Sequence, residues 1–257
     1  MATQQSESTV RQAVRETYGK LAKKSSSGCG CDCGSESAAI GYSRSELEAV
    51  PEGADLGLGS GNPLTLADLQ PGEAVLDLGS GAGIDCFIAA KQVGETGSVI
   101  GVDMTPEMVA RARENAEIGG YRNVDFHLGE IERLAVPDAS VDVIVSNCVI
   151  NLSPDKPSVY REAFRVLRPG GRLAISDIVT TAELPEDARN DLALIAGCVS
   201  GAATADALER MLEQAGFRDI DIRAKDGSLI QVREWKAGDK IADHVVAASV
   251  QAVRPLD

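Results

Sequence analysis

The spacing of apolar residues changes along the chain and divides it into segments. Residues 8–24 place apolar side chains at helical intervals with charged side chains between them, which is typical of an amphipathic helix. The following sequence SSSGCGCDCGSES is rich in serine and glycine and predicts a flexible linker or lid. From residue 73 onward, short apolar runs alternate with helical stretches, which predicts βα units and a parallel sheet.

The apolar runs define the individual elements. The predicted strands are residues 74–78, 98–103, 123–128, 141–146 and 171–178, and the predicted helices between them are residues 84–93, 106–119 and 155–168, the last ending at the sequence RPGG. Because crossovers between parallel strands are right-handed, these units should form a doubly wound α/β sheet with helices on both faces. After them the pattern predicts a helical region over about residues 185–216 and later strands, at least one of them antiparallel, at residues 219–224, 228–233 and 245–253.

The same pattern predicts three parts of one principal domain, since 257 residues can bury one good-sized core. Residues 1–69 should hold the first helix, the cysteine-rich flexible segment and a lid. Residues 70–180 should form the core of the fold. Residues 181–257 should supply helices that cover a substrate and a small C-terminal extension with the final strands.

The strongest chemical signal is the sequence VLDLGSGAG, where a strand runs into a glycine-rich turn that opens a helix. Glycines let the backbone approach a ligand closely, which predicts a ligand that contains a nucleoside. Ile84 stands where a dinucleotide fingerprint has its third glycine, which argues against a nicotinamide cofactor. S-adenosylmethionine (SAM) carries a sulfonium cation and an amino acid, and Asp77 is the better electrostatic match for it.

Later residues support a SAM site. Asp103 ends the second predicted strand, where its carboxylate can accept hydrogen bonds from both ribose hydroxyls. Met104 can pack on the adenine ring, and Glu130 and Ile131 follow the third strand, where they can meet the adenine amino group and ring. The simpler alternatives are that Asp77 only fixes the turn and that Glu130 lies in a solvated loop. The expected cofactor contacts are Asp77, Gly79, Ser80, Gly81, Gly83, Asp103, Met104, Glu130, Ile131 and Asn147.

These features over about residues 70–180 resemble the class I SAM-dependent methyltransferases, which implies a Rossmann-like sheet.

The expected cellular compartment follows from the absence of membrane and export signals in the sequence. No stretch has the length of an apolar membrane span, and the first residues have no signal-peptide core, so we expect a cytoplasmic protein with no membrane partner. In that compartment we do not expect the six cysteines to form structural disulfides.

The cysteines are therefore candidates for chemistry or for packing. Cys148 follows the fourth predicted strand directly, so it should face the crevice where ligands bind in open α/β sheets. Cys198 lies in the region that covers such crevices. Three cysteines on the flexible segment can fold over the same opening; they are Cys29, Cys31 and Cys33. Cys86 is assigned to core packing, and the CGCDC cluster could instead hold zinc or be a redox-labile tail.

Thiolates that converge on one point suit a soft ion. Trivalent arsenic binds three sulfurs in a pyramid and keeps a lone pair, which can attack the methyl group of SAM in line without a general base. The sequences VPEGADLGLGSGNP, LDLGSGAGIDCF, SNCVINLSPDK and GCVSGA resemble the arsenite methyltransferase family over residues 10–223. The resemblance implies that Cys148 and Cys198 bind As(III), and that a thiol near the N-terminal helix helps in binding or in the redox cycle.

One position departs from that family. The segment GLGxGNP usually carries a cysteine, and this chain has Ser60 there. Because a hydroxyl binds arsenic poorly, either a cysteine of the 29–33 cluster replaces the missing thiol or the site works with two thiols. We favour two thiols with help from the N-terminal segment.

Charge and family together define the expected partners. A net charge of −14 argues against nucleic-acid binding, which needs a surface rich in Lys and Arg. We expect arsenite, arriving as a thiol conjugate, as the substrate of a monomeric enzyme, with SAM as cofactor and thioredoxin or glutathione as external thiol reductant. The alternatives are a small-molecule C- or O-methyltransferase of the same fold, and a non-catalytic metalloid-binding protein.

Overall fold

The fold is known from a computed structural model, which describes residues 6–23, 33–184, 191, 195, 197–225 and 244–256, with residues 33–35 as backbone only. The expected strand at residues 228–233 lies outside the described residues, as do Cys29 and Cys31. Most of the expected helical region between residues 185 and 196 also lies outside them.

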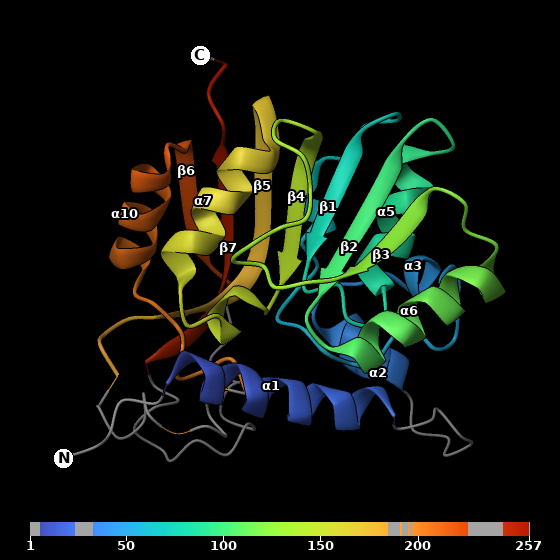
Figure 1. The fold of residues 1–257 in the computed structure, drawn as a ribbon, viewed down its shortest axis with the longest axis horizontal. Helices are drawn as coiled ribbons and strands as arrows, with labels where there is room; N and C mark the ends of the chain where they lie inside the picture. The colour runs from blue at the N-terminus through green and yellow to red at the C-terminus, as the bar shows by residue number, and fades with distance from the viewer. Residues whose placement is uncertain are drawn as a thin grey trace.

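A twisted sheet of seven strands organises the described residues, in the order β3-β2-β1-β4-β5-β7-β6 (Figure 1). The strands are β1 (Ala74–Leu78), β2 (Ser98–Asp103), β3 (Val124–Leu128), β4 (Val141–Asn147), β5 (Leu167–Thr180), β6 (Arg218–Ala224) and β7 (Val245–Val253). β1 to β5 run parallel to one another, whereas β7 is antiparallel to both of its neighbours, β5 and β6. The predicted doubly wound sheet and its antiparallel final strand are confirmed.

Helices connect the strands and cover both faces of the sheet. They are α1 (Glu7–Ala22), α2 (Cys33–Ala39), α3 (Arg44–Glu48), α4 (Leu64–Ala67), α5 (Ile84–Val93), α6 (Pro106–Gly119), the 3₁₀ turn η1 (Ile150–Leu152), α7 (Lys156–Val166) and α10 (Ala205–Ala215). Side chains alternate across each strand. In β1, Val75 therefore packs in the cluster formed with α4, α5 and α6, whereas Leu76 and Leu78 pack in the cluster formed with α7 and α10.

Two boundaries differ from the sequence-based expectation. β5 begins at Leu167, because this residue already pairs with Val141 and because the amide of Gly170 donates to the carbonyl of Arg254. The RPGG sequence therefore lies within a strand rather than in a loop. In the described part of the expected helical region only α10 is a long helix, and it starts where the hydroxyl of Thr204 caps its first turn.

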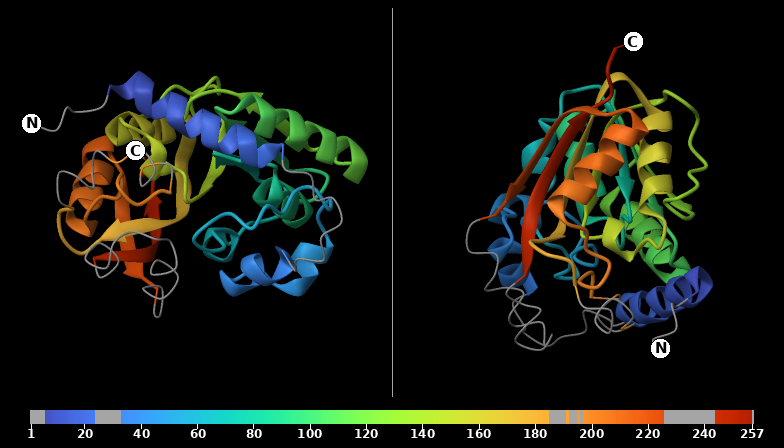
Figure 2. Two further views of the ribbon diagram at one scale, coloured as in Figure 1. Left: turned by 90° about the horizontal axis from the view of Figure 1, so that it is seen from below. Right: turned by 90° about the vertical axis from the view of Figure 1, so that its left-hand side faces the viewer.

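Helix α1 lies across the end of the sheet where the parallel strands finish, and it runs from η1 to α6 (Figures 1 and 2). Val10 and Val14 on its inner side are buried. Arg11 pairs with Glu132 at 3.2 Å, and Arg15 pairs with Glu130 at 2.7 Å. Apolar packing and ion pairs therefore both hold α1 over the sheet end where ligands bind in this class of fold.

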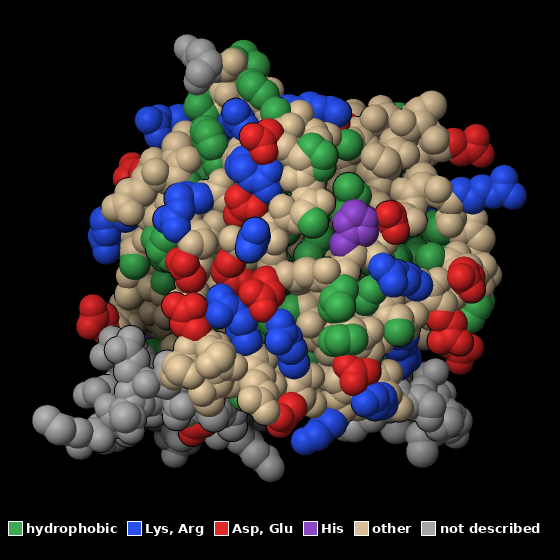
Figure 3. Space-filling model, viewed as in Figure 1, with side chains coloured by type: hydrophobic (Ala, Val, Ile, Leu, Met, Phe, Trp, Pro, Cys, Tyr) green, Lys and Arg blue, Asp and Glu red, His purple; other side chains and the backbone are tan. Residues whose placement is uncertain are grey.

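The outer surface carries charges of both signs. On the face that Figure 3 shows, acidic and basic side chains are interspersed, with no continuous basic area. Among the described residues, no helix combines the length and apolar character needed to cross a bilayer.

Candidate active site

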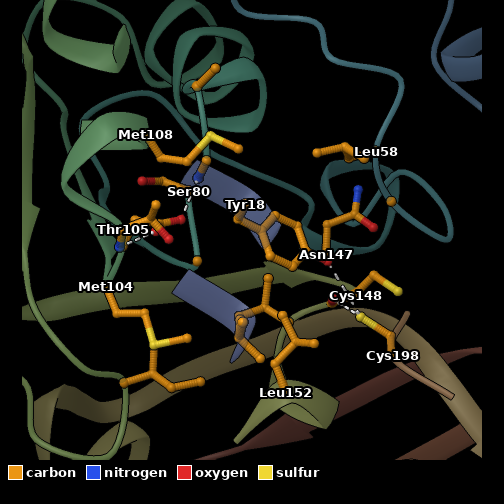
Figure 4. A pocket seen from close by; sticks show the side chains of 18 of the residues that line it. Tyr18, Leu58, Ser80, Met104, Thr105, Met108, Asn147, Cys148, Leu152 and Cys198 are labelled. Atoms are coloured by element: carbon orange, nitrogen blue, oxygen red, sulfur yellow. Dashed lines mark hydrogen bonds between the residues drawn. The ribbon is translucent and has the colours of Figure 1, made fainter. Parts of the chain in front are cut away.

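One pocket opens at the carboxyl ends of β1, β2 and β4, beneath α1 (Figure 4). Its wall combines the glycine turn, the segment after β2, the segment after β4 and Cys198 from the C-terminal half. Tyr18 of α1 points into it, toward the two cysteines. Residues far apart in the sequence therefore meet in one cavity, as the carboxyl-end rule for parallel sheets predicts.

The glycine turn between β1 and α5 forms one end of the pocket. Gly79, Gly81 and Gly83 all have positive φ, of 77°, 52° and 99°. A side chain at Gly79 would overlap with Val149, but a Cβ at Gly81 would meet no atom within 4 Å. The backbone at Gly81 therefore borders open space, which leaves room for a ligand to approach closely.

Polar groups beside this turn are available to bind a ligand. The hydroxyl of Ser80 is buried and has no hydrogen-bond partner among the described residues. Buried polar atoms are almost always paired, so this one has bonding capacity to offer to a ligand. Asp103 accepts hydrogen bonds from the amides of Gly81 (2.9 Å) and Thr105 (2.8 Å). These two bonds fix its carboxylate at the pocket wall and leave lone pairs for two further donors, such as ribose hydroxyls.

The apolar part of the wall suits an aromatic base. Met104, Met108 and Ile131 all line the pocket near Asp103, and Met108 is only 1% exposed. Thioether and branched side chains pack well on flat rings. The pairing of a carboxylate with this apolar patch fits a nucleoside such as that of SAM.

Asp85 is a pocket residue that the sequence analysis did not single out, although it stands two positions after the glycine turn. It accepts a hydrogen bond of 2.7 Å from the hydroxyl of Tyr42. Burial raises the pKa of Asp85 to about 6, against the opposing effect of its hydrogen bonds with Tyr42 and Asn147. An ionised Asp85 at neutral pH would favour a cationic group in the pocket.

Three of the predicted cofactor contacts require correction, because the structure does not place Asp77, Gly83 or Glu130 on the pocket wall. Asp77 is 2% exposed and accepts a hydrogen bond from the Cys86 thiol at 3.3 Å, beneath the turn. Burial, followed by the charge of Asp85, holds the pKa of Asp77 well above its usual range. Glu130 faces α1, where Arg15 engages it, and Glu132 reaches the pocket instead.

Cys148 and Cys198 lie side by side at the other end of the pocket, as Figure 4 shows. The thiol of Cys198 donates to the backbone carbonyl of Cys148 at 2.7 Å, and the hydroxyl oxygen of Tyr18 lies 4.0 Å from the same sulfur. The two cysteines have positive φ, 56° and 62°, a conformation that costs energy outside glycine and that clusters at functional sites. The neighbouring Cys198 and burial together raise the pKa of the Cys148 thiol well above its usual value.

Ser60 borders the thiol pair. The side chain of Ser60 opposes the rise in the pKa of the Cys148 thiol. The hydroxyl oxygen of Ser60 lies 3.3 Å from that of Ser176, and the ammonium group of Lys225 donates to Ser176 at 2.8 Å. The position where the family resemblance implies a third thiol is therefore next to Cys148, but it holds a hydroxyl group.

The other two cysteines in the described residues are Cys86 in α5 and Cys33 in α2. Cys86 is fully buried in the core beneath the glycine turn, which confirms its assignment to packing. Cys33 begins α2, and only its backbone is described. Within the described residues, no group of three Cys, His, Asp or Glu side chains could hold a metal ion.

Comparisons with known proteins place this site in a family. The family model described as a methyltransferase domain matches residues 69–216. The crystal structure of an arsenic(III) S-adenosylmethionine methyltransferase from Chlamydomonas reinhardtii is similar, with a TM-score of 0.63 and 34% identity over 86% of this chain and 73% of that one. The fold, the glycine turn and these matches define a class I SAM-dependent methyltransferase.

Curated relatives narrow the family. The chain is 46% identical to the arsenite methyltransferase of Halobacterium salinarum over 96% of its own length and 67% of that relative. It is 40% identical to the arsenite methyltransferase of Aquipseudomonas alcaligenes, over 91% of its length and 69% of that protein. The protein belongs to the arsenite methyltransferase family.

Proposed function

We propose that this enzyme transfers methyl groups from SAM to trivalent arsenic held by Cys148 and Cys198, and so contributes to arsenic detoxification. The single observation that carries this proposal is the placement of two adjacent thiols at one end of the pocket whose other end is the glycine turn. Soft thiolate ligands suit arsenic, and both groups belong to the described wall. A two-thiol core replaces the three-thiol site that the family resemblance implies.

The chain's own residues hold the two reactants. SAM, when bound, supplies a methyl group on a positively charged sulfur. Asp103 is placed to accept the ribose hydroxyls, and Asp85 to attract the cationic amino acid part. Cys148 and Cys198 hold arsenic at the opposite end of the pocket, where Tyr18 and α1 exclude water. Positioning of this kind can lower a reaction barrier by several kcal/mol.

Each transfer has a redox consequence for the arsenic. The arsenic lone pair forms the As–C bond as the bond between the methyl group and the sulfonium sulfur breaks and S-adenosylhomocysteine leaves, so trivalent arsenic leaves the step as a pentavalent product. Its return to the trivalent state needs two electrons, which two external thiol groups, on one dithiol protein or on two monothiol molecules, supply as they form a disulfide. Thioredoxin or glutathione in the cytoplasm fits this role, and cysteines 29, 31 and 33 are candidates to relay the electrons.

The decisive experiment measures methylation of arsenite by the purified protein with SAM and a thiol reductant. Cys148→Ser and Cys198→Ser should each lower the rate by at least about a hundredfold, because serine is a poor ligand for arsenic. Cys86→Ser is the matched control: it alters a buried thiol that lies in the core, away from the thiol pair, and should keep most of the activity. Full activity in both pocket variants would refute the proposal.

Two other functions make different predictions. A small-molecule C- or O-methyltransferase would turn over SAM with an organic acceptor, and a panel of such acceptors would identify it. A sequestration protein would bind arsenite but would show no heat of SAM binding in calorimetry. The open backbone at Gly81 and the unpaired hydroxyl of Ser80 favour the enzyme over the sequestration protein.

A further inference from the structure

A polar cluster lies behind the thiol pair and has no role in the proposed function as stated so far. It consists of Ser60 from the loop before α4, Ser176 from β5 and Lys225 from the residue after β6. Ser60 and Ser176 are 9% and 0% exposed. None of the three residues belongs to the pocket wall, but the backbone amide of Cys148 donates to the carbonyl of Ser176 at 2.7 Å. The cluster therefore adjoins Cys148.

The cluster is also well ordered by hydrogen bonds. The ammonium group of Lys225 donates to Ser176 at 2.8 Å and approaches the carbonyl oxygen of Ser60 at 3.4 Å. The backbone amide of Ser60 donates to the side chain of Asn147 at 2.9 Å. Asn147 precedes Cys148, so the hydroxyl and ammonium groups are fixed relative to the first thiol.

Trivalent arsenic forms three bonds, and the described site supplies two sulfurs. The three bonds form a pyramid, and the lone pair points to the opposite side. If the lone pair is to face the cofactor, all three ligands must lie away from the glycine turn. Ser60 and Lys225 adjoin Cys148 outside the pocket wall, and no third Cys, His, Asp or Glu joins the two thiols among the described residues, so these polar groups are the candidates to meet the third ligand.

We propose that Ser60 and Lys225, aligned by Ser176, form a subsite for a hydroxyl group that stays bound to arsenic. This inference rests on the proposed function. Arsenous acid, As(OH)₃, reacts with the two thiols to give a species with two As–S bonds and one As–OH bond, and two water molecules leave with the two thiol protons. The oxygen of the remaining hydroxyl accepts hydrogen bonds from Lys225 and Ser60.

The subsite makes the enzyme select inorganic arsenite over organoarsenicals. An arsenical that carries carbon in place of the third hydroxyl offers no acceptor to Lys225, and its carbon group would displace water from a charged group without compensation. Arsenite should therefore gain affinity from Lys225, whereas an organoarsenical bound through the same two thiols should not. The first methylation is favoured over later ones for this reason.

The test compares two arsenicals on the full-length chain in which cysteines 29, 31 and 33 are replaced by serine. Arsenite and phenylarsine oxide are titrated by calorimetry without added thiol, and phenylarsine oxide binds through two sulfurs with carbon as its third ligand. Lys225→Gln should weaken arsenite binding about tenfold, as expected for loss of one charge-assisted hydrogen bond, and leave phenylarsine oxide binding within about twofold. Lys225→Arg should largely restore the affinity for arsenite.

X-ray absorption at the arsenic edge provides a second readout on the same protein. The bound arsenite should show two sulfurs and one oxygen in its first shell, and Ser60→Cys should convert this to three sulfurs. Three sulfurs without that substitution would overturn the inference, as would equal weakening of both arsenicals, or of neither, by Lys225→Gln. If neither arsenical binds, or if binding survives Cys148→Ser, the proposed function itself fails, which is a separate result.

Discussion

Gly81 and Gly120 form a matched pair of residues that separates ligand binding from folding. Both have positive φ, 52° and 68°, and a Cβ at either would meet no atom within 4 Å. Replacement by alanine should therefore cost each a similar amount of stability, about 1 kcal/mol of backbone strain. Only Gly81 borders the pocket.

Gly81→Ala should therefore weaken SAM binding by at least about tenfold, because the methyl group occupies space that the cofactor needs. Gly120→Ala should bind SAM like the wild type. Calorimetry gives the affinities, and thermal unfolding should show similar decreases in Tm for the two variants. Equal SAM affinity in both would contradict the placement of the cofactor over this turn.

The pH dependence of SAM binding should report on Asp85. Because burial raises its pKa to about 6, the carboxylate is charged at pH 7.5 and becomes neutral as the pH falls through 6. A neutral carboxyl attracts the cationic amino acid group less, so affinity should fall several-fold between pH 7.5 and pH 5.5. Asp85→Asn should bind more weakly at pH 7.5 and lose this part of the pH dependence.

The raised pKa of Asp85 affects stability in the opposite direction from SAM binding: the charged carboxylate favours SAM but lowers the stability of the folded protein. The folded protein holds the Asp85 proton up to about pH 6, whereas the unfolded chain releases it near the ordinary value of 3.8. The contribution of this group to the free energy of unfolding therefore decreases as the pH rises from about 4 to about 6. Without SAM, Asp85→Asn should be more stable than the wild type at pH 7.5 in denaturant unfolding.

Some site residues could be predicted from the sequence and others could not. The glycine turn, Asp103 and Cys148 were identifiable because each directly follows an apolar strand, and strand ends in a parallel sheet converge. Lys225 could not be identified, since its place depends on β6 pairing with β7, which brings it near Cys148. Asp77 was misplaced because a strand's last residues alternate between faces, and its carboxylate points into the core.

At the scale of elements, α1 is the one that closes the pocket, and its ion pairs are the features to test. Arg11 is 18% exposed and pairs with Glu132, which lines the pocket and also accepts a hydrogen bond of 2.7 Å from Ser153. Arg11→Ala should raise the KM for SAM about threefold to tenfold, with little change in Tm, because partly exposed ion pairs contribute little to global stability.

Arg44→Ala is the control for this prediction. Arg44 also forms an ion pair, with Glu48 in α3, but its side chain is 90% exposed and lies outside the pocket. Steady-state kinetics should show that the Arg44→Ala variant keeps the wild-type KM for SAM. A similar KM effect in both variants would mean that overall charge, and not the placement of α1, controls cofactor binding.

The elements of the core were predicted to within a few residues, because apolar runs of five or six residues are local signals. In the C-terminal third, the predicted strands at residues 219–224 and 245–253 match β6 and β7, but the order in which they join the sheet was not predicted. β6 has no fully buried residue, and its side chains are half-buried or exposed along the edge of the sheet. Its place beside β7 depends on pairing between strands, and the pattern of one strand carries little of that information.

At the scale of the whole molecule, α1 connects the two ends of the pocket. Arg11 and Val14 line the pocket together with Tyr18, which approaches Cys198. A ligand at either end that holds α1 in place lowers the cost of ordering it for the other ligand. The two substrates should therefore bind with positive coupling.

S-adenosylhomocysteine should tighten arsenite binding about threefold to tenfold, and arsenite should tighten S-adenosylhomocysteine by the same factor, as linkage requires. Tyr18→Ala should reduce the coupling factor to about one while the protein keeps its fold. Paired calorimetric titrations with and without the other ligand give both factors. Unequal factors, or coupling that persists in Tyr18→Ala, would exclude this role for α1.

The position of β7 between β5 and β6 has a consequence for how the chain is made. A ribosome produces β6 before β7, but β6 has no partner in the sheet until β7 has emerged and paired with β5. Lys225 reaches Ser176 only after that step, whereas both thiols are synthesised earlier. A nascent chain can thus display its reactive sulfurs before it completes their surroundings, which makes arsenic a hazard to newly synthesised copies of the enzyme that is meant to remove it.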